Sequence, residues 1–157
     1  MHSNHDPTEA LPTAVPVPIL IADDNDTDIH LLRLAFEKVG IPNRFIVVRD
    51  GQEALDYLAG TIEPRNGHPN IMPKLLILDL NMPRVNGFDV LTWMNKRPQF
   101  GELPVVIFTS SPLEEDRLKA GDLGADEFLV KPMGMTELVE IATVLEERWL
   151  GVHVNGQ

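Results

Sequence analysis

Carboxylates, a hydroxyl and a lysine each follow a short apolar run in this 157-residue chain. Asp23 and Asp24 follow the first run, and Asp79 follows the apolar run Leu-Leu-Ile-Leu at 75–78. Three carboxylates that meet in a partly desolvated cleft repel one another, so the group needs a cation at neutral pH. Because oxygen ligands in a small site favour magnesium, the sequence predicts a Mg²⁺ site.

Asp79 is the candidate nucleophile of this group. A strand that is apolar up to its last residue holds the following carboxylate rigidly, and carboxylates accept phosphoryl groups to form aspartyl phosphates. Thr109 and Lys131, which end or follow two later apolar runs, supply a hydroxyl and an ammonium that can neutralise phosphoryl oxygens. The predicted chemistry is phosphoryl transfer to Asp79.

Short apolar strands alternate with amphipathic helices along the chain, which predicts an α/β fold. We expect a doubly wound, five-stranded parallel sheet of flavodoxin-like order 2-1-3-4-5, with helices on both faces. Ligands of such sheets bind at the carboxyl ends of the strands, where the polar residues lie. The predicted strands are 17–22, 44–48, 74–79, 105–109 and 127–130, and the predicted helices are 26–39, 52–59, 86–97, 113–121 and 136–150.

Composition limits the classes of partner and the setting. The chain has 24 acidic and 13 basic residues, and this net charge of -11 repels nucleic acid and anionic membranes. It has no cysteine and no apolar run of the ~18 residues that a membrane-spanning helix requires. We expect a cytoplasmic protein with a flexible N-terminal tail at 1–16, one domain at 17–150 and a C-terminal tail at 151–157.

Four motifs resemble the response-regulator receiver domains of two-component signalling, over about residues 17–150. They are Ile-Ala-Asp-Asp-Asn at 21–25, Leu-Asp-Leu-Asn-Met-Pro at 78–83 with Gly87 soon after, Phe-Thr-Ser-Ser at 108–111 and Leu-Val-Lys-Pro at 129–132. The long predicted loop at 60–73, Val-Arg-Asp-Gly at 48–51 and Trp149 with Leu150 resemble the stand-alone regulators that are paired with bacterial phytochrome histidine kinases.

The resemblance implies that Asp79 accepts a phosphoryl group from a sensor histidine kinase, with a bacteriophytochrome among the candidate kinases. It also implies that Asp24, Asp79 and the main-chain carbonyl of Asn81 bind Mg²⁺, while Asp23 acts through water. Asn81 and Ser111 flank the site and are expected to set the lifetime of the phosphoryl group.

The same resemblance implies a switch. Thr109 and Lys131 would contact the phosphoryl group, and Thr109 would move toward it while Phe128 turns inward. The bond between Lys131 and Pro132 is expected to be cis, which proline makes physically possible.

Signal output is expected to pass through protein contacts, because only seven residues follow Leu150. The last predicted helix, 136–150, carries an apolar face wider than one core stripe. That width fits either a well-buried terminal helix or an interface, and we expect a homodimer through this helix and its neighbours.

Other classes of protein share parts of this pattern. Phosphatases of the haloacid dehalogenase type also use an aspartate nucleophile, but they need an acid two positions on, where this chain has Asn81. A flavin- or nucleotide-binding module would need a glycine pattern that the chain lacks. A degenerate receiver that binds partners without phosphorylation remains an alternative. By themselves, Asp23 and Asp24 would fit a solvated helix cap, and Asp26 could cap the first helix. We expect a signalling domain and not an enzyme.

Overall fold

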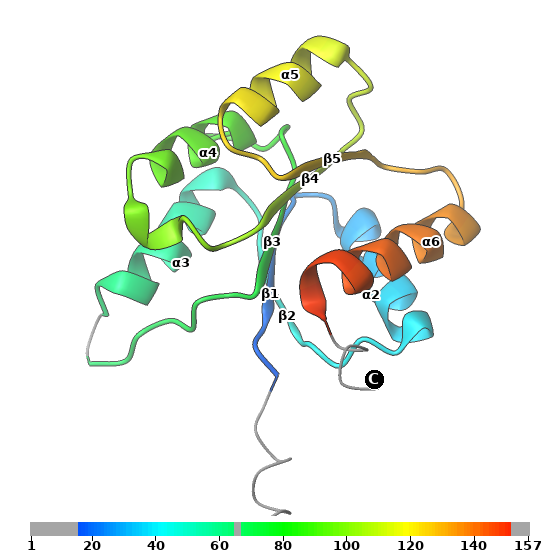
Figure 1. Cartoon of the computed structure of the whole chain (residues 1–157), viewed down its shortest axis with the longest axis horizontal. Coiled ribbons are helices and arrows are strands. Elements are labelled where there is room, and N and C mark those ends of the chain that lie inside the picture. The colour runs from blue at the N-terminus through cyan, green and yellow to red at the C-terminus, as the bar shows by residue number, and fades with distance from the viewer. Residues whose placement is uncertain (1–15, 65–66, 152–157) are drawn as a thin grey trace, which may run out of the picture.

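Five parallel strands form one sheet in the order β2-β1-β3-β4-β5 (Figure 1), as predicted. The computed structural model describes residues 16–64 and 67–151. The predicted tails at 1–16 and 151–157 lie almost entirely outside the described residues, so these bounds stay predictions. The strands are β1 (Ile19–Ala22), β2 (Phe45–Val48), β3 (Leu75–Leu78), β4 (Val105–Thr109) and β5 (Glu127–Val130).

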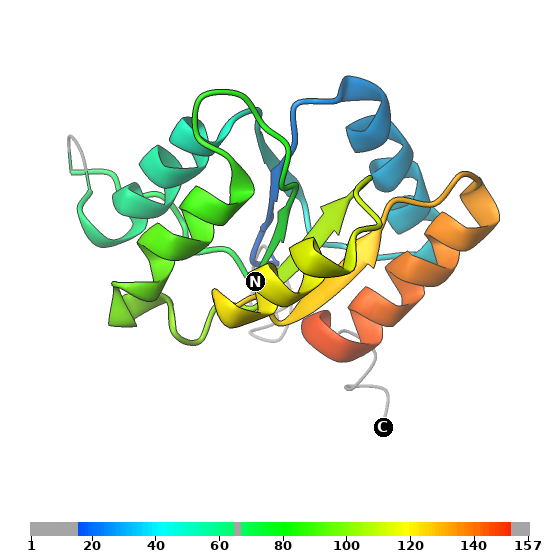
Figure 2. The same cartoon turned by 90° about the horizontal axis from the view of Figure 1, so that it is seen from above.

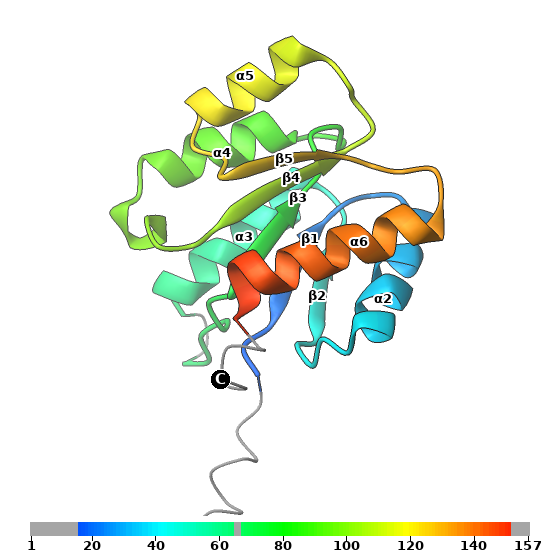
Figure 3. The same cartoon turned by 45° about the vertical axis from the view of Figure 1, so that its right-hand side comes forward.

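Helices cover both faces of the sheet, with α2 and α6 on one face and α3, α4 and α5 on the other (Figure 2). The helices α2 and α6 lie side by side (Figure 3). Over the described ranges, none of the helices is long and apolar enough to cross a membrane. The helices are α2 (Asp26–Val39), α3 (Gly51–Ile62), α4 (Gly87–Asn95), α5 (Glu114–Asp122) and α6 (Met135–Leu145).

Two short elements were not predicted. The 3-10 turn η1 (Pro98–Phe100) follows α4, and its proline takes the first helical position, where no donor is needed. The predicted last helix is regular only to Leu145 and then continues as the π-helical turn η2 (Glu146–Leu150). The N-cap of α2 is Asn25, so Asp26 is the first helical residue and not the cap.

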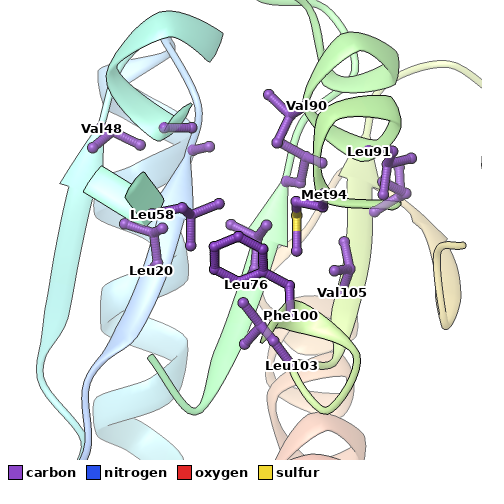
Figure 4. Packing of buried hydrophobic residues seen from close by; sticks show 14 of the residues in the cluster. Leu20, Val48, Leu58, Leu76, Val90, Leu91, Met94, Phe100, Leu103 and Val105 are labelled. Atoms are coloured by element: carbon purple, nitrogen blue, oxygen red, sulfur yellow. The ribbon is translucent and has the colours of Figure 1, made fainter. Parts of the chain in front are cut away.

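The core has two halves, one on each side of the sheet. In β1, Leu20 packs among the residues of the α3–α4 side (Figure 4), whereas Ile19 and Ile21 pack on the α2–α6 side. Side chains of a strand alternate between faces, so a strand that is covered on both sides must be apolar throughout. This is why the β1 and β3 sequences show no polar alternation, and why they lie at the centre of the sheet.

The long connection from α3 to β3 folds back on α3. The main-chain N–H of Asn70 donates to the carbonyl of Gly60 at 3.0 Å, and its side chain donates to the carbonyl of Tyr57 at 2.9 Å. The Tyr57 hydroxyl donates to the carbonyl of Ile71 at 2.6 Å. The predicted helix 52–59 was too short. These contacts give hydrogen-bond donors to main-chain carbonyls in its last turns, and the helix therefore extends to Ile62.

The loop between β3 and α4 is fixed against the start of α3. Asp50 caps α3 by accepting from the N–H of Glu53 at 2.8 Å, and it also accepts from Arg84 at 2.6 Å. The bond from Glu53 is the larger and the bond from Arg84 the smaller cause of the lowered pKa of Asp50. Arg84 has a positive φ of 65°, an uncommon conformation for a residue with a side chain. A Cβ atom at Gly51 would overlap the carbonyl oxygen of Val85, so the two backbones meet directly.

Gly51→Ala is therefore expected to lower the free energy of unfolding by about 1–3 kcal/mol, because the new methyl group forces the two backbones apart. Urea denaturation measures this loss. Gly121→Ala is the matched control, since Gly121 lies in α5 with nothing near its Cβ position. Alanine should stabilise that exposed helical site by about 0.5–1 kcal/mol. Equal effects of the two substitutions would contradict the packing argument.

Candidate functional site

An acidic cluster lies at the carboxyl edge of the central strands. The pairing of Ala22 with Leu78 places the residues that follow β1 and β3 next to each other. Carboxylate oxygens of Asp23, Asp24 and Asp79 all lie within 4.8 Å of one another. Asp23 and Asp79 are buried, with exposed fractions of 4% and 6%, while Asp24 is exposed. The structure thus brings together the three acids that the sequence singled out.

The ammonium of Lys131 lies inside this cluster. Its Nζ is 3.0 Å from Asp79 Oδ2, 2.8 Å from Asp23 Oδ2 and 2.8 Å from Asp28 Oδ2. The contacts with Asp28 and Asp79 are hydrogen bonds, and the contact with Asp23 is an ion pair. Burial opposes the charge of Lys131, but the contacts with Asp23 and Asp28 and the charge of Asp79 outweigh it and raise the pKa of Lys131. Burial raises the pKa of Asp23 despite its contact with Lys131.

Main-chain N–H groups orient the two buried carboxylates. Asp23 Oδ1 accepts from the N–H of Asn25 at 2.9 Å, and Asp79 Oδ1 accepts from the N–H of Asn81 at 3.2 Å. A Cβ atom at Gly87 would lie 2.5 Å from the carbonyl oxygen of Asp79, so α4 can start this close only with glycine. The carboxylate of Asp79 therefore has one oxygen bound by backbone and one facing Lys131.

Thr109 and Ser111 lie at the end of β4. Thr109 is fully buried, and its hydroxyl oxygen accepts from the N–H of Ser111 at 3.4 Å. The main-chain N–H of Lys131 donates to the carbonyl of Thr109 at 2.7 Å, which links β4 to the residue that carries the ammonium. The Ser111 hydroxyl donates to Asp116 Oδ2 at 2.6 Å. Through that bond the site is connected to the first turn of α5.

The two remaining candidates lie on and after β5. Phe128 is half-buried against the core on the α5 side, and the guanidinium of Arg117 lies 4.8 Å from its ring centroid. The prediction of a cis bond before Pro132 is wrong, because the described peptide bonds are all trans. Trans is the favoured isomer of such bonds by about 0.5–1 kcal/mol, and the trans chain passes from β5 into α6 through an extended Gly134.

The residues of the cluster fit a magnesium ion. Three carboxylates from two strand ends supply hard oxygen ligands, and one lysine offsets only part of their charge. Asn81 follows Asp79 in the same loop, and its main-chain carbonyl stays a predicted further oxygen ligand. Carboxylate oxygens of Asp23, Asp24 and Asp79 lie close enough to one another to meet at one cation.

Sequence reasoning missed Asp28 and Asp116. An acid in the first turn of a helix is commonly there for the helix dipole, so neither residue stood out. Asp28 meets Lys131 across 103 positions of sequence, which depends on how α2 and the end of β5 are placed in the fold. The acidic residues of the first turns of α2 and α5 were the only signal available.

A sheet of this order, with carboxylates, a hydroxyl and a lysine at one edge, defines a phosphoacceptor domain of the receiver class. The chain belongs to the family of response regulator receiver domains, whose family model matches residues 19–143. It is thus a receiver domain of two-component signalling.

Its relatives include regulators linked to phytochromes. The chain is 32% identical to the probable methanogenesis regulatory protein FilR2 of Methanothrix harundinacea, over 93% of this chain and 92% of FilR2. It resembles the crystal structure of the phosphorylated cyanobacterial phytochrome response regulator RcpA (TM-score 0.75, 32% identity, 86% of this chain and 94% of RcpA). It also resembles the Mn²⁺-bound form of Rcp1, a protein of Synechocystis (TM-score 0.75, 30% identity, 87% of this chain and 96% of Rcp1).

Lys131→Met is expected to lower the free energy of unfolding in metal-free buffer by about 3 kcal/mol, because it leaves buried carboxylates without their cation. Added Mg²⁺ should reduce this loss, since a divalent ion can neutralise the same carboxylates. Urea denaturation with a chelator and with Mg²⁺ measures both effects. Lys38→Met removes an exposed charge at the end of α2 and serves as the control. A loss that is equal for both variants would contradict the site-specific role.

Proposed function

We propose that Asp79 accepts a phosphoryl group from a phosphohistidine of a sensor histidine kinase and that the domain then changes its protein contacts. The observation that carries this proposal is the ammonium of Lys131, 3.0 Å from the carboxylate of Asp79 in the acidic cluster. A nucleophile and a cation are thereby placed at one point on the carboxyl edge of the sheet.

In the transfer step, a carboxylate oxygen of Asp79 forms a bond to phosphorus while the P–N bond of the phosphohistidine breaks. The electron pair of that bond stays on the imidazole, which leaves as the neutral ring when its other nitrogen carries a proton. Lys131 and Thr109 neutralise the phosphoryl oxygens. A Mg²⁺ ion held by Asp23, Asp24, Asp79 and the Asn81 carbonyl would supply further positive charge for these oxygens when bound.

Similarity to the phytochrome response regulator RcpA and to the bacteriophytochrome response regulator RtBRR supports a phytochrome-type histidine kinase as the phosphoryl donor. Such a pairing would place the chain in the cytoplasm, where kinases of this type have access to ATP. RcpA has been crystallised in a phosphorylated form and Rcp1 in a Mn²⁺-bound form, which supports a phosphoryl group and a divalent cation in this chain as well.

The switch would run from the site to α5. As Thr109 moves toward the phosphoryl group, Ser111 moves with it, and the hydrogen bond from Ser111 reaches Asp116 in α5. This helix buries only Ala120, so it can shift at little cost in packing. Phe128, which lies under Arg117 of the same helix, would adjust its ring. Asn81 and Ser111, next to the acceptor, would set how long the phosphoryl group survives.

An alternative function as a haloacid dehalogenase-type phosphatase has less support. That chemistry needs a proton donor two residues after the nucleophile, and the amide of Asn81 cannot act as one. Here the N–H of Asn81 donates to Asp79, which is a role in holding the carboxylate.

A homodimer through α6 is the second part of the proposal. Leu138, Ala142 and Leu145 are buried against the sheet, whereas Ile141 and Val144 are only half-buried. Ile141 packs against the core cluster, whereas Val144 lies outside it and is the apolar side chain suited to contact with a second copy.

Val144→Lys should therefore shift the chain from dimer to monomer, with a dimer dissociation constant raised by roughly tenfold or more, because it places a charge in the apolar contact. Size-exclusion chromatography with light scattering across micromolar concentrations, with and without phosphorylation, measures this. Val17→Lys, at another exposed apolar site, is the control and should leave the mass unchanged. A wild type that is monomeric in both states would rule out the dimer.

Acetyl phosphate with Mg²⁺ should add one phosphoryl group to the wild type, detected by intact mass. Asp79→Asn should abolish the adduct, because an amide oxygen is a poor nucleophile, and a chelator should abolish it in the wild type. Asp122→Asn, which changes an exposed acid of α5, should leave it intact. If the wild type forms no adduct, the chain is a degenerate receiver that binds partners without phosphorylation.

A further inference from the structure

We propose that Asp28 is a positioning residue for phosphoryl transfer: it holds the ammonium of Lys131 beside Asp79 and keeps it there when the phosphoryl group arrives. This inference rests on the proposed function of Asp79. Asp28 is not one of the three carboxylates that form the metal cluster. It touches the reaction only through Lys131.

The first observation is the contact itself. Asp28 Oδ2 lies 2.8 Å from Lys131 Nζ, as close as Asp23 and closer than Asp79. The Lys131 side chain is only 11% exposed, so water has limited access to replace a lost partner. The Asp28 side chain is 32% exposed and covers the ammonium on the α2 side.

The second observation is that the Asp28 carboxylate does not form the helix-capping bond that a residue at its position would normally form. In α4, Asn86 and Asp89 form a complete capping box, since each side chain bonds the main-chain N–H of the other. Asn25 and Asp28 have the same spacing at the start of α2, and Asn25 likewise accepts from the N–H of Asp28 at 2.9 Å. The reciprocal bond is absent from this described pair, because the N–H of Asn25 donates to Asp23 instead. The Asp28 carboxylate therefore remains available for Lys131.

These bonds make one rigid unit of the end of β1 and the start of α2. Asn25 binds Asp23 through its N–H and fixes the backbone of Asp28 through its side chain. Two carboxylates, five residues apart, are thereby presented to the same ammonium. The position of Lys131 then depends on α2 as well as on the sheet.

Charge explains why a third carboxylate is needed. Asp23 and Asp79 belong to the metal cluster, so a bound divalent cation would share their charge. Once Asp79 is phosphorylated, its acceptor oxygen is part of an acyl phosphate and attracts the ammonium less. Asp28 lies outside the metal cluster and does not take the phosphoryl group. With a hydrogen bond to Asp28 and an ion pair with Asp23 holding the ammonium, the N–H that faces Asp79 can turn to a phosphoryl oxygen.

Phosphorylation rates at saturating Mg²⁺, measured against acetyl phosphate concentration, test the inference. Asp28→Ala should lower the maximal rate by about tenfold with little change in the half-saturating concentration, since the ammonium is displaced and not the donor site. Asp28→Asn, which keeps an acceptor but loses the charge, should lie between. Asp26→Asn removes a charge from the same turn, where Asp26 pairs with Arg49, and should stay within about twofold of wild type.

A double-mutant cycle with Lys131→Met identifies the route of the effect. If Asp28 acts through Lys131, Asp28→Ala should have no further effect on the rate in that background. The cycle is repeated on the urea midpoint of metal-free protein, which needs no phosphorylation, and should show the same coupling. Lys131→Gln replaces Lys131→Met if the latter does not fold.

The outcomes separate the two proposals. A wild type without any phosphoryl adduct would overturn the function of Asp79 and this inference with it. A phosphorylated wild type with Asp28→Ala at an equal rate would overturn the inference alone. So would a slow Asp28→Ala whose effect persists without Lys131, or one that Asp26→Asn reproduces, because Asp28 would then act on helix stability.

Discussion

The repulsion among the carboxylates that meet at one edge of the sheet is the constraint on which the rest of this structure depends. Burial makes the repulsion stronger and the loss of solvation larger, and one ammonium is placed to offset both. The central strands must be covered on both faces to bring Asp23 and Asp79 to adjacent positions, and backbone N–H groups must hold each carboxylate in place. The same excess of negative charge that makes the site costly also makes it suited to a divalent cation.

Much of this arrangement could be predicted from the sequence, because it depends on local patterns. Apolar runs that end in Asp23, Asp79 and Thr109 predict buried strands with polar ends, and the alternation with helices predicts the strand order. What could not be predicted depends on side chains that meet across the fold. The contact of Asp28 with Lys131 needs the placement of α2 beside the end of β5, and the isomer of the bond before Pro132 depends on how α6 approaches the sheet. The extra turns of α3 need the contacts of Asn70, which sequence spacing does not reveal.

The helices around the site are packed unequally. On one face, α2 and α6 contact each other closely and bury large side chains such as Phe36 and Leu145. On the other, α5 buries a single alanine and is held by polar and cation–π contacts, among them those of Asp116 and Arg117. Contacts of this kind are individually weak and can be exchanged without opening a cavity, so α5 is the helix able to respond to chemistry at Asp79.

The two ends of α3 contact different parts of the structure. This bears on where the length of the chain can vary. The start of α3 braces the loop that follows Asp79 through Asp50 and Gly51, while its end carries the long connection that folds back through Asn70. A helix of 12 residues spans about 18 Å, so the two attachments are far apart. Insertions or deletions in the connection would thus be absorbed at a distance from the phosphoacceptor, and the length of this segment can diverge among relatives while the geometry of the site is retained.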